Sequence, residues 1–153
     1  MPGLATIVTV VLVAAALALV VIALRRRPRG GPRRDATPPA GGPQIGERWL
    51  ADVPFADEPR RSKERPVLVI GYSGRGYWAL KCTTQEPRDA GWRVAAPANR
   101  WEPPADKDGW VDLVPNHLPR ARFDHSFGRI GDQGLYRKIT GRLRWERAVD
   151  FTR

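Results

Sequence analysis

The sequence PVLVIGYSGRGYWALKC, residues 66–82, has the clearest structural pattern in this chain. Its first five residues form a short apolar, β-branched run with a proline at the leading edge, where a strand tolerates a missing N–H. The sequence YSGRG at 72–76 is rich in turn-forming residues, and the run at 77–82 is typical of a returning strand. The stretch therefore predicts a β-hairpin.

Other short apolar runs separated by turn residues extend this hairpin into a predicted sheet. Further strands are expected at residues 47–53, 92–96, 110–113 and 120–124, and Pro54 stops the first of them. Many short strands with turns between them are typical of a small barrel or sandwich. The sequence thus predicts a mainly β domain.

The hydrophobic period changes near the end of the chain. Leu135, Ile139 and Leu143 are spaced i, i+4 and i+8, and Asp132 stands before them as a candidate N-cap. We expect one amphipathic C-terminal helix that packs on the sheet and has no chemical role of its own.

Residues 4–24, LATIVTVVLVAAALALVVIAL, carry no charge. At about 1.5 Å per residue, a helix of this length spans roughly 30 Å of hydrocarbon, which is enough for one membrane crossing. The chain begins without the basic residues of a signal peptide, and the apolar run ends in arginines instead of a cleavage site. Residues 1–24 are therefore predicted to be a transmembrane anchor.

A cluster of six arginines follows the anchor: Arg25, Arg26, Arg27, Arg29, Arg33 and Arg34. Basic residues beside a membrane helix normally stay on the cytoplasmic side. We therefore expect a single-pass protein of the inner cell membrane with its domain in the cytoplasm. The lone Cys82, which has no disulfide partner in the chain, agrees with this reducing compartment.

Residues 25–43 are rich in proline, glycine and arginine and are interpreted as a linker, which leaves residues 44–153 as the domain. The net charge of the chain is +10, and the arginine cluster accounts for six of its 26 basic residues. The domain itself holds 20 basic and 15 acidic residues. This excess is compatible with a polyanionic partner such as nucleic acid.

Two segments, IGERWLADVPF at 45–55 and KERPVLVI at 63–70, resemble the opening of the PemK/MazF-like toxins. That family opens with a Gly-acid-aromatic strand, a polar loop and an Arg-Pro-aliphatic strand. The segment LKCTTQ at 80–85 is similar to the family's strand that ends in a threonine. Residues 108–113 and the terminal helix stand where the family has its last strands and its closing helix.

The resemblance implies a small SH3-like barrel, usually a homodimer, that cleaves single-stranded RNA at short sequences and is neutralised by a separate antitoxin protein. It implies no metal and no cofactor. The 2′-hydroxyl of the RNA attacks the adjacent phosphorus and leaves a cyclic phosphate, so the protein must stabilise charge on the phosphoryl oxygens.

Matched by position, Arg65 corresponds to the family's catalytic arginine and Thr83 to its catalytic threonine. An arginine offers a planar, permanently charged fork that fits two phosphate oxygens, and a threonine hydroxyl can donate to a phosphate oxygen. Without the resemblance, Arg65 would be an ordinary turn residue and Thr83 an ordinary strand former.

The residues predicted to contact RNA lie beside this pair: Arg60, Arg61, Lys63, Thr84 and Gln85. A basic loop can hold an RNA backbone, although a solvated loop without a ligand has the same composition. The sequence departs from the family at Arg48, where an aliphatic residue is usual.

His117 and His125 are the only histidines and could in principle serve as acid and base for RNA cleavage. They have no spacing signature, so we interpret them as surface or structural residues. One cysteine and two scattered histidines predict no metal site.

Two functions remain open at this point. The first is an active, membrane-tethered endoribonuclease that uses Arg65 and Thr83. The second is a catalytically inactive barrel that binds nucleic acid or protein at the inner membrane surface, because a fold can persist after its chemistry is lost.

Overall fold

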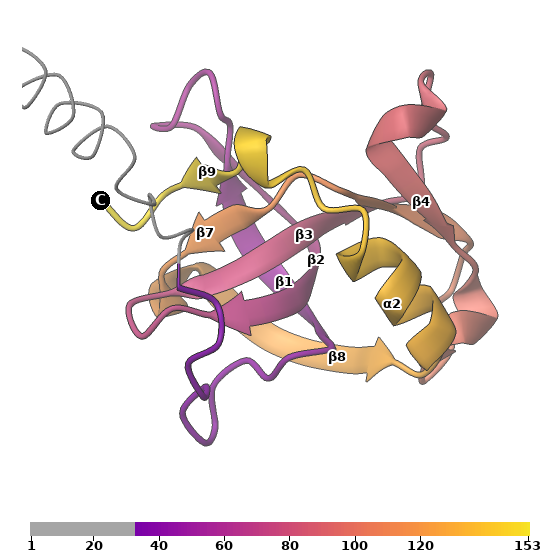
Figure 1. Ribbon diagram of the computed structural model, residues 1–153, viewed down its shortest axis with the longest axis horizontal. Helices are drawn as coiled ribbons and strands as arrows, with labels where there is room; N and C mark the ends of the chain where they lie inside the picture. Colours follow the sequence, from indigo (N-terminus) through magenta and orange to yellow (C-terminus); the bar gives the residue numbers. More distant parts are fainter. Residues whose placement is uncertain (1–32) are drawn as a thin grey trace, which may run out of the picture. The chain divides into compact units, whose positions relative to one another are not determined.

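A computed structural model describes residues 33–153, which contain nine strands and one α-helix (Figure 1). The strands are β1 (Glu47–Pro54), β2 (Ser62–Tyr72), β3 (Tyr77–Thr83), β4 (Arg93–Ala96), β5 (Trp101–Glu102), β6 (Gly109–Asp112), β7 (Asn116–Leu118), β8 (Phe123–Ile130) and β9 (Val149–Asp150). The helix is α2 (Gln133–Thr140), and short 3-10 turns occupy Ala90–Trp92, Ala98–Arg100, Arg120–Arg122 and Trp145–Arg147.

The predicted anchor at 1–24 lies outside the described residues, and so does the arginine cluster up to Arg29. Within residues 33–153, no helix is long and apolar enough to cross a membrane.

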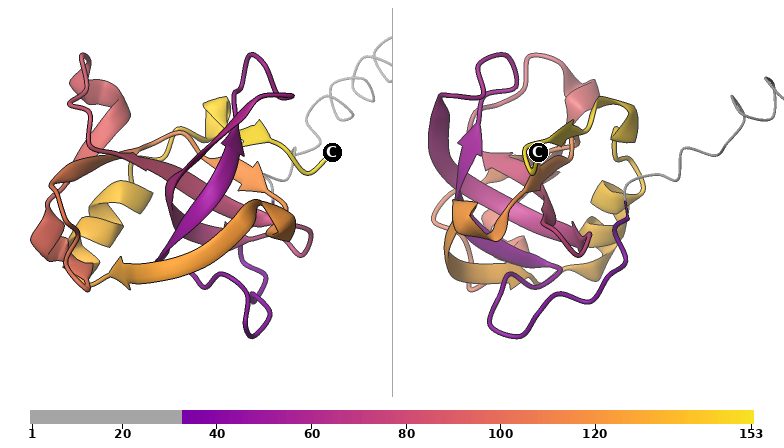
Figure 2. Two further views of the ribbon diagram at one scale, coloured as in Figure 1. Left: turned by 180° about the vertical axis from the view of Figure 1, so that it is seen from behind. Right: turned by 90° about the vertical axis from the view of Figure 1, so that its left-hand side faces the viewer.

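The strands pair in the order β4-β6-β3-β2-β1-β8-β5, and all neighbours in this path are antiparallel. Strand β7 pairs with β3 on one side and, in parallel, with β9 on the other. Figure 2 shows that the strands curve around the buried interior. The prediction of a mainly β domain with one helix is confirmed.

The predicted hairpin is present and longer than expected, because β2 already begins at Ser62. Its register runs from Val67 opposite Lys81 to Tyr72 opposite Tyr77, and the turn closes where the Ser73 N–H donates to the Gly76 carbonyl at 2.9 Å. Gly74 has a φ of 90° in this turn, a conformation that glycine adopts without steric cost.

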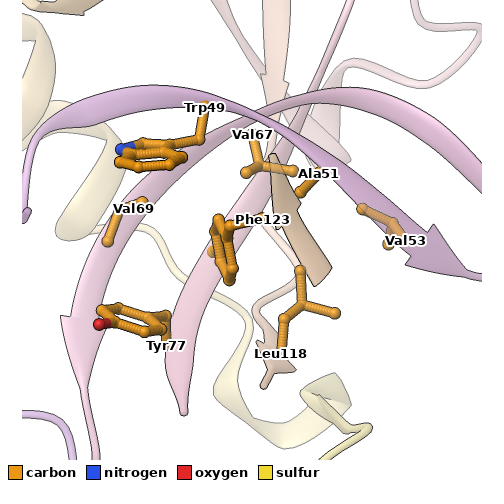
Figure 3. Packing of buried hydrophobic residues seen from close by; sticks show 9 residues of the cluster. Trp49, Ala51, Val53, Val67, Val69, Tyr77, Leu118 and Phe123 are labelled. Atoms are coloured by element: carbon orange, nitrogen blue, oxygen red, sulfur yellow. The ribbon is translucent and has the colours of Figure 1, made fainter. Parts of the chain in front are cut away.

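Both faces of this hairpin are buried, so its residues contribute to both hydrophobic clusters of the domain. One face, with Val67, Val69 and Tyr77, joins a cluster that also contains Trp49 and Phe123 (Figure 3). In that cluster, Phe123 meets Trp49 and Tyr77 edge-on, at ring centroid distances of 6.2 and 5.3 Å. Such contacts stabilise a core beyond the area that they bury.

The other face of the hairpin packs against α2. Leu68 and Leu80 are fully buried there in a second cluster with Ile139 of the helix. Asp132 accepts a hydrogen bond from the Leu135 N–H at 2.9 Å, so the predicted N-cap is confirmed. The helix ends at Thr140, and Leu143 packs on the cluster from beyond its end.

The strand predicted at 120–124 is wrong in its boundaries. Residues Arg120–Arg122 form a 3-10 turn in which the Arg122 N–H donates to the Pro119 carbonyl at 3.0 Å. Strand β8 begins only at Phe123 and continues to Ile130. Buried and exposed residues alternate only weakly in β8. The hydrophobic pattern of the sequence therefore did not reveal the true bounds of this strand.

The compact unit begins at Arg33, before residue 44, where the domain is expected to start from the composition of the chain. Residues 33–36 lie along β2, where the Tyr72 N–H donates to the Arg34 carbonyl and the Ala36 N–H donates to the Tyr72 carbonyl, both at 3.1 Å. The Trp78 indole donates to the Arg33 carbonyl at 3.1 Å. These bonds attach a segment of linker-like composition to the sheet.

Candidate functional site

A pocket of about 410 Å³ opens at the point where β3 leaves β2. The ladder between these strands ends with Val67 opposite Lys81. Beyond it, β3 pairs with β6, with Cys82 opposite Val111 and Thr83 opposite Trp110. The divergence of the two strands leaves room between their ends for a ligand.

Arg65 and Thr83, the two predicted catalytic residues, both line this pocket. They stand two residues beyond the last β2–β3 pair, at positions that would face each other if the ladder continued. The Thr83 Oγ1 accepts the Gln85 N–H at 3.1 Å, which leaves its own proton available to donate.

The predicted RNA-contacting residues divide into two groups. Lys63, Thr84 and Gln85 line the pocket with Arg65. Arg60 and Arg61 are exposed and are not among the residues that line it. Arg61 pairs with Glu58 at 3.0 Å instead.

The pocket is strongly cationic. Its two carboxylates are those of Glu64 and Asp112, and its six basic residues are Arg48, Lys63, Arg65, Lys81, Arg93 and Lys107. Within residues 33–153, only Lys81 among these six pairs with a carboxylate, Asp112 at 3.8 Å. Unpaired cations in a shared concavity attract anions.

Arg48 was not predicted as a site residue. It lies on β1, and its guanidinium carbon is 4.7 Å from the Trp101 ring centroid and 4.5 Å from that of Phe127. Burial lowers the pKa of this arginine below its usual value, although an arginine remains charged at neutral pH. The sequence did hold a signal, namely a charged residue where the resembled family is aliphatic.

A second pocket of about 740 Å³ adjoins the first, because both are lined by Arg65, Lys81, Gln85, Arg93 and Asp112. Its own lining includes two aromatic side chains, Phe55 and Trp92, and it holds as many carboxylates as basic groups. The cationic character is therefore concentrated in the first pocket.

Cys82 also lines the first pocket, but its thiol is a poor nucleophile. Burial raises the pKa of this thiol to about 12, so it stays protonated at neutral pH. Its side chain packs against the cluster around Leu80, as expected for a small apolar residue.

A separate network joins the β2–β3 turn to β9. The Ser73 Oγ is 2.7 Å from the His117 Nε2, and the His117 Nδ1 is 2.9 Å from an Asp150 carboxylate oxygen. These distances match those of a Ser-His-Asp triad. The Ser73 Oγ also accepts the N–H groups of Arg75 and Gly76, both at 3.1 Å.

The surroundings of His117 give this network a structural role. His117 is 2% exposed, and its ring stacks on Trp78 at a centroid distance of 4.3 Å. A general base must reach the substrate, and a ring covered in this way does not. His125, in contrast, is exposed and pairs with Asp124 at 2.8 Å.

This network predicts an acid-sensitive contribution to stability. Burial opposes ionisation of Asp150, but the hydrogen bonds from Thr152 and His117 outweigh it and lower the carboxyl pKa to about 2. The ionised carboxylate therefore stabilises the fold by about 2 kcal/mol above pH 4, and this contribution is lost as the pH falls toward 2. Urea unfolding between pH 6 and pH 2 should show a smaller loss of stability in Asp150→Asn than in the unaltered chain. Equal losses would contradict the assignment.

Comparison of the sequence with models of known protein families gives no match, and none of the curated proteins matches it.

Proposed function

We propose that this chain is a membrane-tethered endoribonuclease of the PemK/MazF type, with an SH3-like barrel that cleaves single-stranded RNA. The observation that carries the proposal is the cationic pocket: Arg65 and Thr83 line it together, and basic groups outnumber carboxylates there by six to two. RNA is a polyanion, so a concave surface with unpaired cations favours its binding.

The chemistry that these residues support is transesterification within the RNA. The 2′-hydroxyl passes its proton to water while its oxygen forms a bond to the adjacent phosphorus. The bond from phosphorus to the 5′-oxygen of the next nucleotide breaks, and that oxygen takes a proton from water, so a 2′,3′-cyclic phosphate and a 5′-hydroxyl result. Arg65 donates to the non-bridging oxygens, where negative charge increases in the transition state. The Thr83 hydroxyl donates a hydrogen bond to a phosphoryl oxygen and keeps its proton. Neither role requires a metal ion.

The same proposal includes a subcellular location and two protein partners. The apolar run at 4–24 and the arginines after it support an inner-membrane anchor with a cytoplasmic domain. The anchor would restrict cleavage to RNA near the membrane by raising the effective concentration there. A homodimer and an antitoxin protein are proposed partners, from the resemblance alone.

An assay with a mixed pool of single-stranded RNA tests the proposal directly. The full chain, purified in a non-ionic detergent, should cleave the pool at short sequences and leave cyclic-phosphate ends, at the same rate with or without a metal chelator. Thr83→Val removes the hydroxyl at nearly constant volume and should lower the rate by about 100-fold. Thr83→Ser keeps the hydroxyl and should retain most of the activity.

The outcome separates the two functions that the sequence left open. Tight binding of RNA without any cleavage would reject the nuclease and favour a binding module at the membrane surface. Cleavage that is equal in Thr83→Val and in the unaltered chain would place the chemistry elsewhere.

A further inference from the structure

We propose that Arg48 is a second phosphate-binding residue of the pocket and holds a backbone phosphate of the same polynucleotide that Arg65 engages. The identity of the polynucleotide as RNA rests on the proposed function, but the binding role of Arg48 does not depend on cleavage.

The first observation concerns hydrogen bonding. Two buried side-chain nitrogen atoms in residues 33–153 have no hydrogen-bond partner in the protein, the Nε atoms of Arg48 and Arg65. Both residues line the same pocket. These Nε atoms are covered by protein, so a ligand in the pocket would meet the two guanidinium groups at their terminal nitrogen atoms. Because an arginine without protein partners still has donors to satisfy, two such groups in one concavity favour a ligand that accepts hydrogen bonds.

The second observation concerns charge. Neither Arg48 nor Arg65 forms a salt bridge with any carboxylate of residues 33–153. The burial that lowers the pKa of Arg48 is a desolvation of its charge, which an anionic ligand would offset. The ligand that satisfies both arginines is therefore an anion.

The third observation concerns rigidity. The guanidinium carbon of Arg48 lies over the rings of Trp101 and Phe127, at 4.7 and 4.5 Å from their centroids. Trp101 is itself buried, so this arrangement restricts the orientation of the planar fork. A fork fixed before binding loses little entropy when the ligand arrives.

The pocket favours a polynucleotide over a single small anion. Its cations come from five separated parts of the chain: Arg48 on β1, Lys63 and Arg65 on β2, Lys81 on β3, Arg93 on β4, and Lys107 in the loop before β6. A ligand with several phosphates can engage cations spread in this way. Trp110 also lines the pocket and offers an apolar ring beside them, on which a base can stack.

Binding to an oligonucleotide that cannot be cleaved tests this role. The probe is a single-stranded RNA pool whose 2′-hydroxyls are methylated, mixed with the full chain in a non-ionic detergent at several salt concentrations. We expect Arg48→Leu to weaken binding by about 10- to 100-fold. The slope of log affinity against log salt should become shallower by about 0.7, the value for one phosphate contact on a single strand.

Two further variants keep the result interpretable. Arg48→Lys retains the charge but lacks the fork, so we expect the salt slope to be unchanged and the affinity to fall by about 3- to 10-fold. Arg137→Leu, on the exposed side of α2 and outside the pocket, should leave both quantities unchanged. Thermal unfolding identifies any variant that does not fold, and Arg48→Lys alone then decides the matter.

The proposal is overturned if Arg48→Leu folds and binds with the affinity and salt slope of the unaltered chain, or if Arg48→Lys shows full affinity. These outcomes are distinct from failure of the nuclease. A chain that binds through Arg48 but never cleaves RNA would reject the proposed reaction and support the binding role of Arg48. Cleavage that is unaffected by Arg48→Leu would support the reaction and reject the binding role.

Discussion

Arg65→Ala should lower the rate of RNA cleavage by about 1000-fold and should abolish any growth arrest that expression of the full chain causes. The residue lines the cationic pocket, has no carboxylate partner in residues 33–153 and lies 5.7 Å from the Phe55 ring. In the proposed reaction, its loss removes a charged fork from the position where negative charge would develop, and one such donor accounts for about 100- to 1000-fold in rate. Single-turnover cleavage of a fluorescent RNA measures the effect.

Arg137→Ala is the matched control, since Arg137 is exposed on α2 and does not line the pocket. It should cleave at the rate of the unaltered chain. Arg65→Lys should recover only a small part of the activity, because an ammonium group cannot bind two phosphoryl oxygens as a fork does. Growth arrest that persists unchanged in Arg65→Ala would show that the site is misplaced.

Gly109→Ala should lower both activity and stability. A Cβ atom at this position would lie 2.6 Å from the Thr83 carbonyl oxygen, a backbone atom that cannot rotate away. Strands β3 and β6 would have to separate where Thr83 enters the pocket. We expect a loss of about 1–3 kcal/mol in the free energy of unfolding, and about a 100-fold loss in cleavage rate because the hydroxyl is displaced.

Gly91→Ala is the control for this effect. Its Cβ atom would meet nothing closer than an Asp89 carboxylate oxygen at 3.4 Å, which is ordinary contact. Chemical denaturation and cleavage assays on both variants separate a local steric effect from the general cost of replacing glycine. A stable, fully active Gly109→Ala would contradict the close approach of β6 to β3.

The parts of the fold that the sequence predicted best are those specified by neighbouring residues. The β2–β3 hairpin has a proline edge, two apolar runs and a glycine-rich turn within 17 residues, and Asp132 caps a helix only a few residues away. Strands β5, β7 and β9 contain only two or three residues each. Runs this short have no detectable period, so only their tertiary partners define them.

The residues of the candidate site likewise fall into two groups, those that a local sequence pattern predicted and those that only the folded structure brings to the pocket. Arg65 and Thr83 lie on the two strands of the hairpin and were predicted from a resemblance in short motifs. Arg48, Arg93 and Lys107 reach the pocket from other parts of the chain, and no local pattern connects them. The hydrogen bond between Ser73 and His117 spans 44 residues, which explains why neither residue could be assigned a partner beforehand.

The network at His117 also sets an order of events in the synthesis of the protein. Asp150 follows His117 by 33 residues, and at about 5–20 residues/s the ribosome needs roughly 2–7 s to add them. During this interval the hairpin with Arg65 and Thr83 is already complete in sequence, but β7 still lacks its parallel neighbour β9. The nascent domain therefore passes through a stage in which the β2–β3 hairpin and His117 are complete in sequence but the Asp150 partner of His117 is missing, and the mature fold is reached only after β9 emerges.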